Sequence, residues 1–203
     1  MTTPSDPSNG FHAVPEDQLR AGTYSLLAAL LRAPLSADLR VRLLGIDARD
    51  PDAGGIAGAW AALREAAEGA ALAAVDDEFH ALFIGIGRGE LVPYGSWYRS
   101  GFLMEKPLGD LRRALTALGF ERQISVREPE DHAAALCEVM AILITDGATF
   151  EVQQRFFKGH IGPWIRAFCA DLDKAPSARF YRAVGEFGQA FFRLESDYLS
   201  MPI

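Results

Sequence analysis

The sequence predicts an all-α protein, because apolar residues recur at helical spacing along nearly the whole chain and no segment alternates like a strand. The chain has 203 residues, of which 49% are hydrophobic and 23% charged. A chain of this size can bury a core without disulfides or metals. We therefore expect a single-domain helical bundle over residues 13–203, preceded by a disordered tail over residues 1–12, which is polar and rich in Pro, Ser and Thr.

Helix starts in the N-terminal half are indicated by proline, acidic residues and breakers. Pro15 followed by Glu16 and Asp17 is typical of a first turn, where proline fits and acids face the positive end of the helix dipole. The apolar stripe that follows stops before Pro34. Further helices are expected at residues 36–44, at residues 56–74 beyond a loop at 50–55, and from Asp76 through Phe83.

The segment 85–101 departs from the helical pattern. Its glycines and Pro93 predict a long irregular loop, yet it carries Tyr94, Trp97 and Tyr98. Long loops inside compact domains are uncommon and are often functional. Large aromatic side chains in such a loop must be packed or used for binding.

Helical spacing resumes at residues 108–118 and ends at Gly119, a favourable C-terminal cap. The string 128–131, Glu-Pro-Glu-Asp, predicts the start of a helix that runs to Thr145. Thr149 is expected to cap the next helix, which Gly162-Pro163 should kink. The last helix is expected to start at Pro176.

Charge and cysteine usage narrow the function classes. A net charge of −7 and a pI near 5.1 argue against nucleic-acid binding, which needs a basic face. The N-terminus lacks a signal-peptide pattern and no apolar run could span a bilayer, so we expect a cytoplasmic protein without stable membrane insertion. Cys137 and Cys169 lie in apolar stretches and predict packed, reduced thiols. Histidine and cysteine spacing predicts no metal, and we expect no cofactor.

Three motifs resemble the TorD/DmsD/NarJ family of redox-enzyme maturation chaperones. The first is the aromatic-x-x-Leu-Phe string at 79–83, followed by the loop 92–98 with its Pro, Ser and aromatics. The second is Glu-Pro-x-Asp-His at 128–132. The third lies in 153–172 and combines Phe, His, Pro-Trp and Asp-Leu. They occur in the family's order, with helical spacing between them.

The resemblance implies a non-enzymatic chaperone with an all-helical fold of the TorD/DmsD type. Such a chaperone binds the twin-arginine leader, and part of the catalytic subunit, of a molybdopterin-containing oxidoreductase. It holds this cargo for cofactor insertion and prevents premature export. Helix exchange between protomers in this family makes a homodimer a further expectation to be tested.

A twin-arginine leader calls for an apolar groove that has carboxylates near one end, since apolar anchors supply binding energy and carboxylates pair with guanidinium groups. A groove between the irregular segment 85–101 and the helix expected at Pro129 would provide apolar anchors and carboxylates, with Leu103 as a further lining residue. The predicted peptide-binding residues are Phe79, Leu82, Phe83, Pro93, Tyr94, Ser96, Trp97, Glu128, Pro129, Asp131 and His132.

Structural roles compete with these assignments. The i, i+3, i+4 spacing of Phe79, Leu82 and Phe83 is more typical of a core face, and helix capping alone explains the acids at 128–131. A small helical enzyme with Asp131 and His132 as an acid–base pair, near Glu138, is the alternative function.

His160 is expected to hydrogen-bond backbone groups freed by the kink. The glycines at 85–90 lack the Gly-Lys-Ser/Thr ending of a phosphate loop.

Overall fold

The computed structural model describes residues 15–48, 54–85, 88–121 and 128–202. These residues form helices joined by turns, and a single isolated bridge between Tyr94 and His132 is the only β-type pairing among them. The prediction of an all-α fold is therefore confirmed. The predicted tail at residues 1–12 lies outside the described residues.

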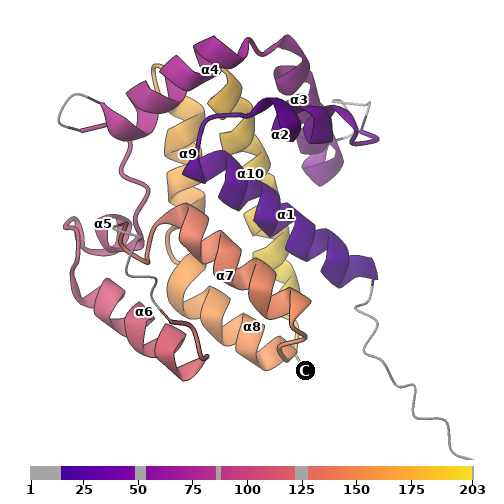
Figure 1. Cartoon of the computed structure of the whole chain (residues 1–203). Coiled ribbons are helices and arrows are strands. Elements are labelled where there is room, and N and C mark those ends of the chain that lie inside the picture. Colours follow the sequence, from indigo (N-terminus) through magenta and orange to yellow (C-terminus); the bar gives the residue numbers. More distant parts are fainter. Residues whose placement is uncertain (1–14, 49–53, 86–87, 122–127, 203) are drawn as a thin grey trace, which may run out of the picture.

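The centre of the bundle is the pair α9 (Ile165–Lys174) and α10 (Phe180–Tyr198), which run side by side through the middle of Figure 1. Gly185 permits their close approach, because a Cβ there would lie 2.7 Å from the backbone nitrogen of Asp173. The buried face of α10 carries Tyr181, Phe187 and Phe192, each almost fully shielded from solvent. Helix α3 (Gly55–Gly69) packs against the same helix.

A second layer consists of α1 (Pro15–Arg32) and α7 (Ala133–Thr145), which pack on each other and are drawn in front of α9 and α10 in Figure 1. A buried polar cluster ties this layer to α10. The Arg20 guanidinium donates from Nε and Nη2 to both carboxylate oxygens of Glu195, at 2.7 and 3.0 Å, and from Nη1 to Oε1 of Gln153. The Tyr24 hydroxyl also donates to Glu195, at 2.9 Å. The sequence indicated none of these long-range pairs.

Two predicted helix starts are confirmed by their caps. Ser36 accepts from the backbone N–H of Leu39 and precedes α2 (Ala37–Leu44). Thr149 accepts from the N–H of Val152 and precedes α8 (Phe150–Phe156). A serine or threonine before an apolar run satisfies an otherwise unpaired donor of the first turn.

The helix expected at 56–74 ends earlier, at Gly69 of α3, and the helix expected from Asp76 through Phe83 begins earlier, as α4 (Leu72–Phe79), which a π-helical turn, η2 (His80–Ile84), follows. The chain bends at Ala70 and Ala71, which are both extended. Arg40 of α2 explains the end of α3, because its guanidinium donates to the carbonyls of Ala67 and Glu68, each at 2.8 Å. Those carbonyls would otherwise need the next helical turn.

Three further expectations about the elements were wrong. The segment 85–101 contains a short helix, α5 (Gly95–Ser100), before α6 (Lys106–Ala117). The last helix starts at Phe180 and not at Pro176, because a carboxylate from α4 caps it there. The kink expected at Gly162-Pro163 is a full break between a π-helical turn, η3 (Phe157–Ile161), and α9.

Cys137 and Cys169 are free and buried, and burial raises the pKa of both thiols above the ordinary value. Both therefore stay protonated at neutral pH, as packed thiols. No helix in the described part of the chain is both long and apolar enough to cross a membrane.

Candidate peptide-binding surface

Phe79 and Leu82, two of the predicted peptide contacts, belong to the hydrophobic core. The ring of Phe79 lies 5.0 Å from that of Phe83 and 5.9 Å from that of Tyr181. Phe83 is half-buried at the edge of the same cluster. The i, i+3, i+4 spacing therefore marks a core face here, and only Phe83 keeps surface that a peptide could reach.

Backbone hydrogen bonds join the loop 92–98 to the turn before α7. The N–H of Gly95 donates to the carbonyl of Asp131 at 2.9 Å, and the N–H of Ala133 donates to the carbonyl of Pro93 at 2.8 Å. The ring of Tyr94 stands edge-on to that of His132, with centroids 5.1 Å apart. The loop 92–98 and the second motif are thus neighbours in the fold, and they contact each other directly rather than across a furrow.

Asp131 is a buried positioning residue in this arrangement, with 3% of its surface exposed. Its Oδ2 accepts from the N–H of Ser96 at 2.7 Å, so the carboxylate holds the first turn of α5. The expectation that Glu128, Pro129 and Asp131 open α7 was wrong, because that helix begins at Ala133. Pro129 is half-buried and Glu128 is exposed.

The third motif meets the other two beneath α5. Trp164 is buried with its Nε1 donating to the carbonyl of His160 at 2.8 Å. A Cβ on Gly95 would lie only 3.0 Å from that Nε1, so glycine lets α5 sit directly on the indole. The loop 92–98 and the second and third motifs therefore converge on one junction, made of Gly95, Ser96, Asp131, His160 and Trp164.

This junction contains polar atoms that lack a partner within the described residues: Ser96 Oγ, Asp131 Oδ1 and His160 Nδ1. Asp131 and His160 also line the same small cavity, of about 10 Å³. The expectation for His160 was therefore wrong in one respect. Its backbone carbonyl, and not its ring, makes the bond to Trp164.

His132 caps α7, and its Nδ1 accepts from the N–H of Ala134 at 3.1 Å. Burial, and then the positive charge of Arg32, lower its pKa from 6.5 to about 4, so the ring is neutral at pH 7. The side chain of Asp131 is instead directed to Ser96. The two side chains point to different backbone donors, and this geometry does not support their use as an acid–base pair.

The depressed pKa of His132 predicts an acid-dependent loss of stability. Between pH 6.5 and 4 the unfolded chain binds the proton more readily than the folded chain, so stability rises with pH through this window. The contribution is fully present above pH 6.5, and on the order of 3 kcal/mol is lost as the pH falls to about 4. Urea unfolding of wild type and His132→Asn from pH 7 to 4 measures it, since asparagine can also cap a helix. Parallel pH profiles for the two proteins would contradict this assignment.

An exposed apolar surface lies directly beyond the junction. Trp97 is half-buried on α5 under the Arg88 guanidinium, which lies 4.4 Å from the ring centroid. The following turn exposes Phe102, Leu103 and Met104, with exposed fractions of 68%, 46% and 71%. We call Trp97 and residues 102–104 the α5 surface. Sequence reasoning used only Leu103, although three consecutive large apolar residues after Gly101 were the available signal.

The glutamates at positions 105, 128 and 130 differ in their exposure and in their ion pairs. Glu128 and Glu105 are exposed, and Glu105 directly follows the apolar turn. Glu130 is paired with the Arg112 guanidinium of α6, at 2.9 Å. Asp131 is buried, whereas Glu128 and Glu105 are exposed and could be reached by a cationic ligand.

Comparisons with known proteins agree with the motifs. A family model described as the nitrate reductase delta subunit matches residues 49–170, more than half of the chain. The chain is 27% identical over 138 residues to the chaperone protein TorD of Vibrio atlanticus, which covers 61% of this chain and 63% of that protein. It is 36% identical over 86 residues to the chaperone protein TorD of Shewanella amazonensis, or 42% and 36% of the two chains. The matches thus span less than two thirds of these relatives.

A solved structure shares the fold. The crystal structure of a protein from Archaeoglobus fulgidus, described as a redox enzyme maturation protein, superimposes with a TM-score of 0.54 and covers 94% of this chain and 99% of that one. The sequences are 14% identical, so this likeness concerns the fold alone.

Proposed function

Since the chain belongs to the family of the nitrate reductase delta subunit, whose matched relatives are named TorD chaperones, we propose that it is a non-enzymatic chaperone for redox-enzyme maturation. Its cargo is the twin-arginine leader and catalytic subunit of a molybdopterin-containing oxidoreductase. It binds this cargo in the cytoplasm, before export, and needs no cofactor of its own.

The observation that carries this proposal is the α5 surface. Monomeric proteins seldom expose contiguous large apolar side chains without a binding role. Here Phe102, Leu103 and Met104 are exposed in succession, in the turn that follows the helix carrying the half-buried Trp97. Aromatic and Met side chains are common anchors for peptides, because they bury large areas and adapt in shape.

The proposal needs a source of charge as well as apolar anchors. A twin-arginine leader presents guanidinium groups next to a moderately apolar stretch. Glu105, which directly follows residues 102–104 in the chain, and Glu128 are exposed carboxylates, and arginine pairs with carboxylates through two parallel hydrogen bonds. Asp131 and Ser96 act through position, by holding α5 in place, while Tyr94 and His132 form the partly exposed rim.

Trp97→Ala is expected to weaken binding of the cognate leader about tenfold, because a buried aromatic anchor is lost. Calorimetric titration of synthetic twin-arginine leaders from the molybdoenzymes of the same organism measures this. Phe102→Ala should weaken binding as well. Because the side chain of Phe102 is exposed, unfolding of this variant would not explain the loss. Leu19→Ala, equally exposed but on α1, is the matched control and should bind as wild type does. Failure of the folded wild-type protein to bind any such leader would contradict the proposed function.

A further inference from the structure

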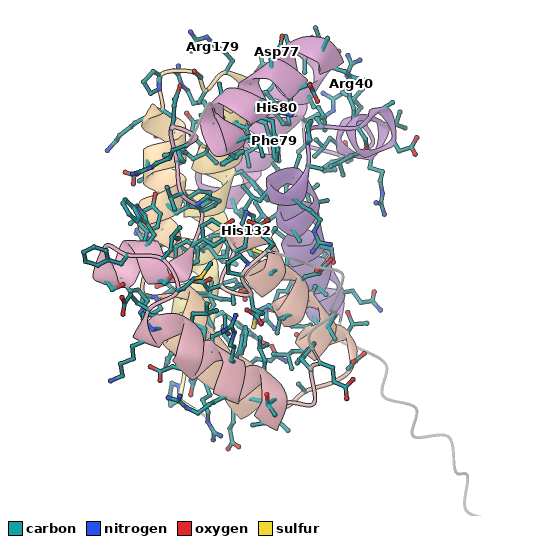
Figure 2. The ribbon with its side chains drawn as sticks, turned by 60° about the vertical axis from the view of Figure 1, so that its left-hand side comes forward. Arg40, Asp77, Phe79, His80, His132 and Arg179 are labelled. Carbon is teal, nitrogen blue, oxygen red and sulfur yellow. The ribbon has the colours of Figure 1, made fainter. Side chains whose placement is uncertain are left out.

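A second surface feature lies apart from α5, at the corner between α3 and α4. It is a groove of about 670 Å³ between this corner and the turn that connects α9 to α10. Figure 2 labels Asp77 and Arg179, which line it, at the top of the molecule, and His132 lies well below them. This volume is in the range of peptide side-chain and small-ligand sites.

The groove is lined mainly by small apolar side chains, including Ala66, Ala70, Ala74 and Ala81, with Phe180 at one wall. Small side chains let the backbone of a bound segment approach closely and leave room for that segment's own apolar groups. An apolar peptide helix or extended segment therefore fits the groove better than a polar ligand does.

Both walls of the groove are held in fixed positions. Arg40 binds the carbonyls at the end of α3. The Glu78 carboxylate accepts from the backbone N–H groups of Arg179, Phe180 and Tyr181, at 2.8, 3.1 and 2.7 Å. A preformed groove binds a segment with a smaller ordering cost than a mobile one.

Asp77, Glu78 and Arg179 are the charged residues that line the groove, so its formal charge is net negative. The Arg179 guanidinium donates to the carbonyls of Pro176 and Ala178, and the carboxylate of Glu78 is used by α10. The carboxylate of Asp77 is exposed and has no partner among the described side chains, whereas that of Asp76 lies 3.5 Å from the ring of His80. Asp77 therefore favours a cationic group at its end of the groove.

The groove is connected to the α5 surface through the chain. Glu90, in the segment that leads from η2 to α5, accepts hydrogen bonds from both the N–H and the hydroxyl of Ser177 in the groove wall.

We infer that this groove binds an apolar segment of the cargo leader, with a basic residue of that segment on Asp77. The inference rests on the proposed function and adds a second subsite to it. Apolar lining and a free carboxylate match the two chemical features of a twin-arginine leader, a hydrophobic stretch and cationic side chains.

Ala74→Trp tests the inference because the new side chain would fill the groove from an exposed position of α4. Titration of the full-length variant with the synthetic leader that binds wild type best should give about tenfold weaker binding. Ala73→Trp is the matched control, since Ala73 is the exposed neighbour on the same helix and does not line the groove. Asp77→Asn should weaken binding about threefold, less so at high salt, and Asp76→Asn should not.

The outcomes separate the two proposals. Weaker binding by Ala74→Trp with an unchanged Ala73→Trp supports the groove as a subsite. Unchanged binding by Ala74→Trp, while Phe102→Ala is weakened, overturns the groove inference and leaves the proposed function intact. Absence of leader binding to wild type overturns both, and self-association that Ala74→Trp abolishes would identify a second copy of the chain as the occupant instead.

Discussion

Replacing Arg20 by methionine is expected to lower the free energy of unfolding by about 3–5 kcal/mol. The guanidinium is 5% exposed and makes two hydrogen bonds to Glu195, which is fully buried. Removing it leaves an unpaired carboxylate in the core, and the desolvation of that charge is no longer offset. The Tyr24 hydroxyl would remain its main donor. Urea unfolding of the two proteins at pH 7 measures the difference.

The double variant Arg20→Met/Glu195→Gln separates charge from packing. It removes the unpaired charge, and its amide oxygen can still accept from Tyr24, so it should recover much of the lost stability. Arg42→Met, at an exposed position of α2, is the control and should change stability little. Equal losses in the single and double variants would show that the buried charge is not the cause.

Glu78→Ala is expected to cost about 2–4 kcal/mol, the second large effect. The carboxylate satisfies three backbone N–H groups at the start of α10, and it lies at the positive end of that helix. Alanine leaves these donors without their carboxylate partner, and two of the donors belong to the buried residues Phe180 and Tyr181. Denaturant unfolding followed by circular dichroism measures the loss.

Two variants make the Glu78 result specific. Glu78→Gln should be less damaging than alanine, because the amide oxygen can still accept from part of the set. Asp76→Ala on the same helix removes only an exposed contact to His80 and should be nearly neutral. If Asp76→Ala destabilised the protein as much as Glu78→Ala, the cap would not explain the loss.

Local signals in the sequence predicted those parts of the fold that depend on neighbours in the chain. The side chains of Ser36 and Thr149 each accept a hydrogen bond from the backbone N–H three residues ahead, and such bonds follow from spacing alone. The start of α10 could not be predicted in the same way, because its cap is Glu78, about a hundred residues earlier. Pro176 was a plausible helix start by local rules, and a distant carboxylate decided otherwise.

The candidate site shows the same difference between local contacts, which the sequence indicates, and long-range contacts, which it does not. The sequence singled out Asp131 and His132 as candidate ligand contacts, but their structural roles depend on the N–H groups of Ser96 and Ala134, which spacing does not place. The groove could not be foreseen either. A run of alanines favours one continuous helix, and only the bend at Ala70 and Ala71, supported by Arg40, creates a corner.

The unpaired polar atoms beneath α5 affect local opening of the structure. Buried hydroxyl, carboxylate and imidazole atoms without partners regain hydration whenever water reaches them. Transient separation of α5 from Trp164 therefore costs less free energy than opening a fully satisfied interior. The helix that presents Trp97 therefore lies over an interior whose hydration carries a reduced free-energy cost.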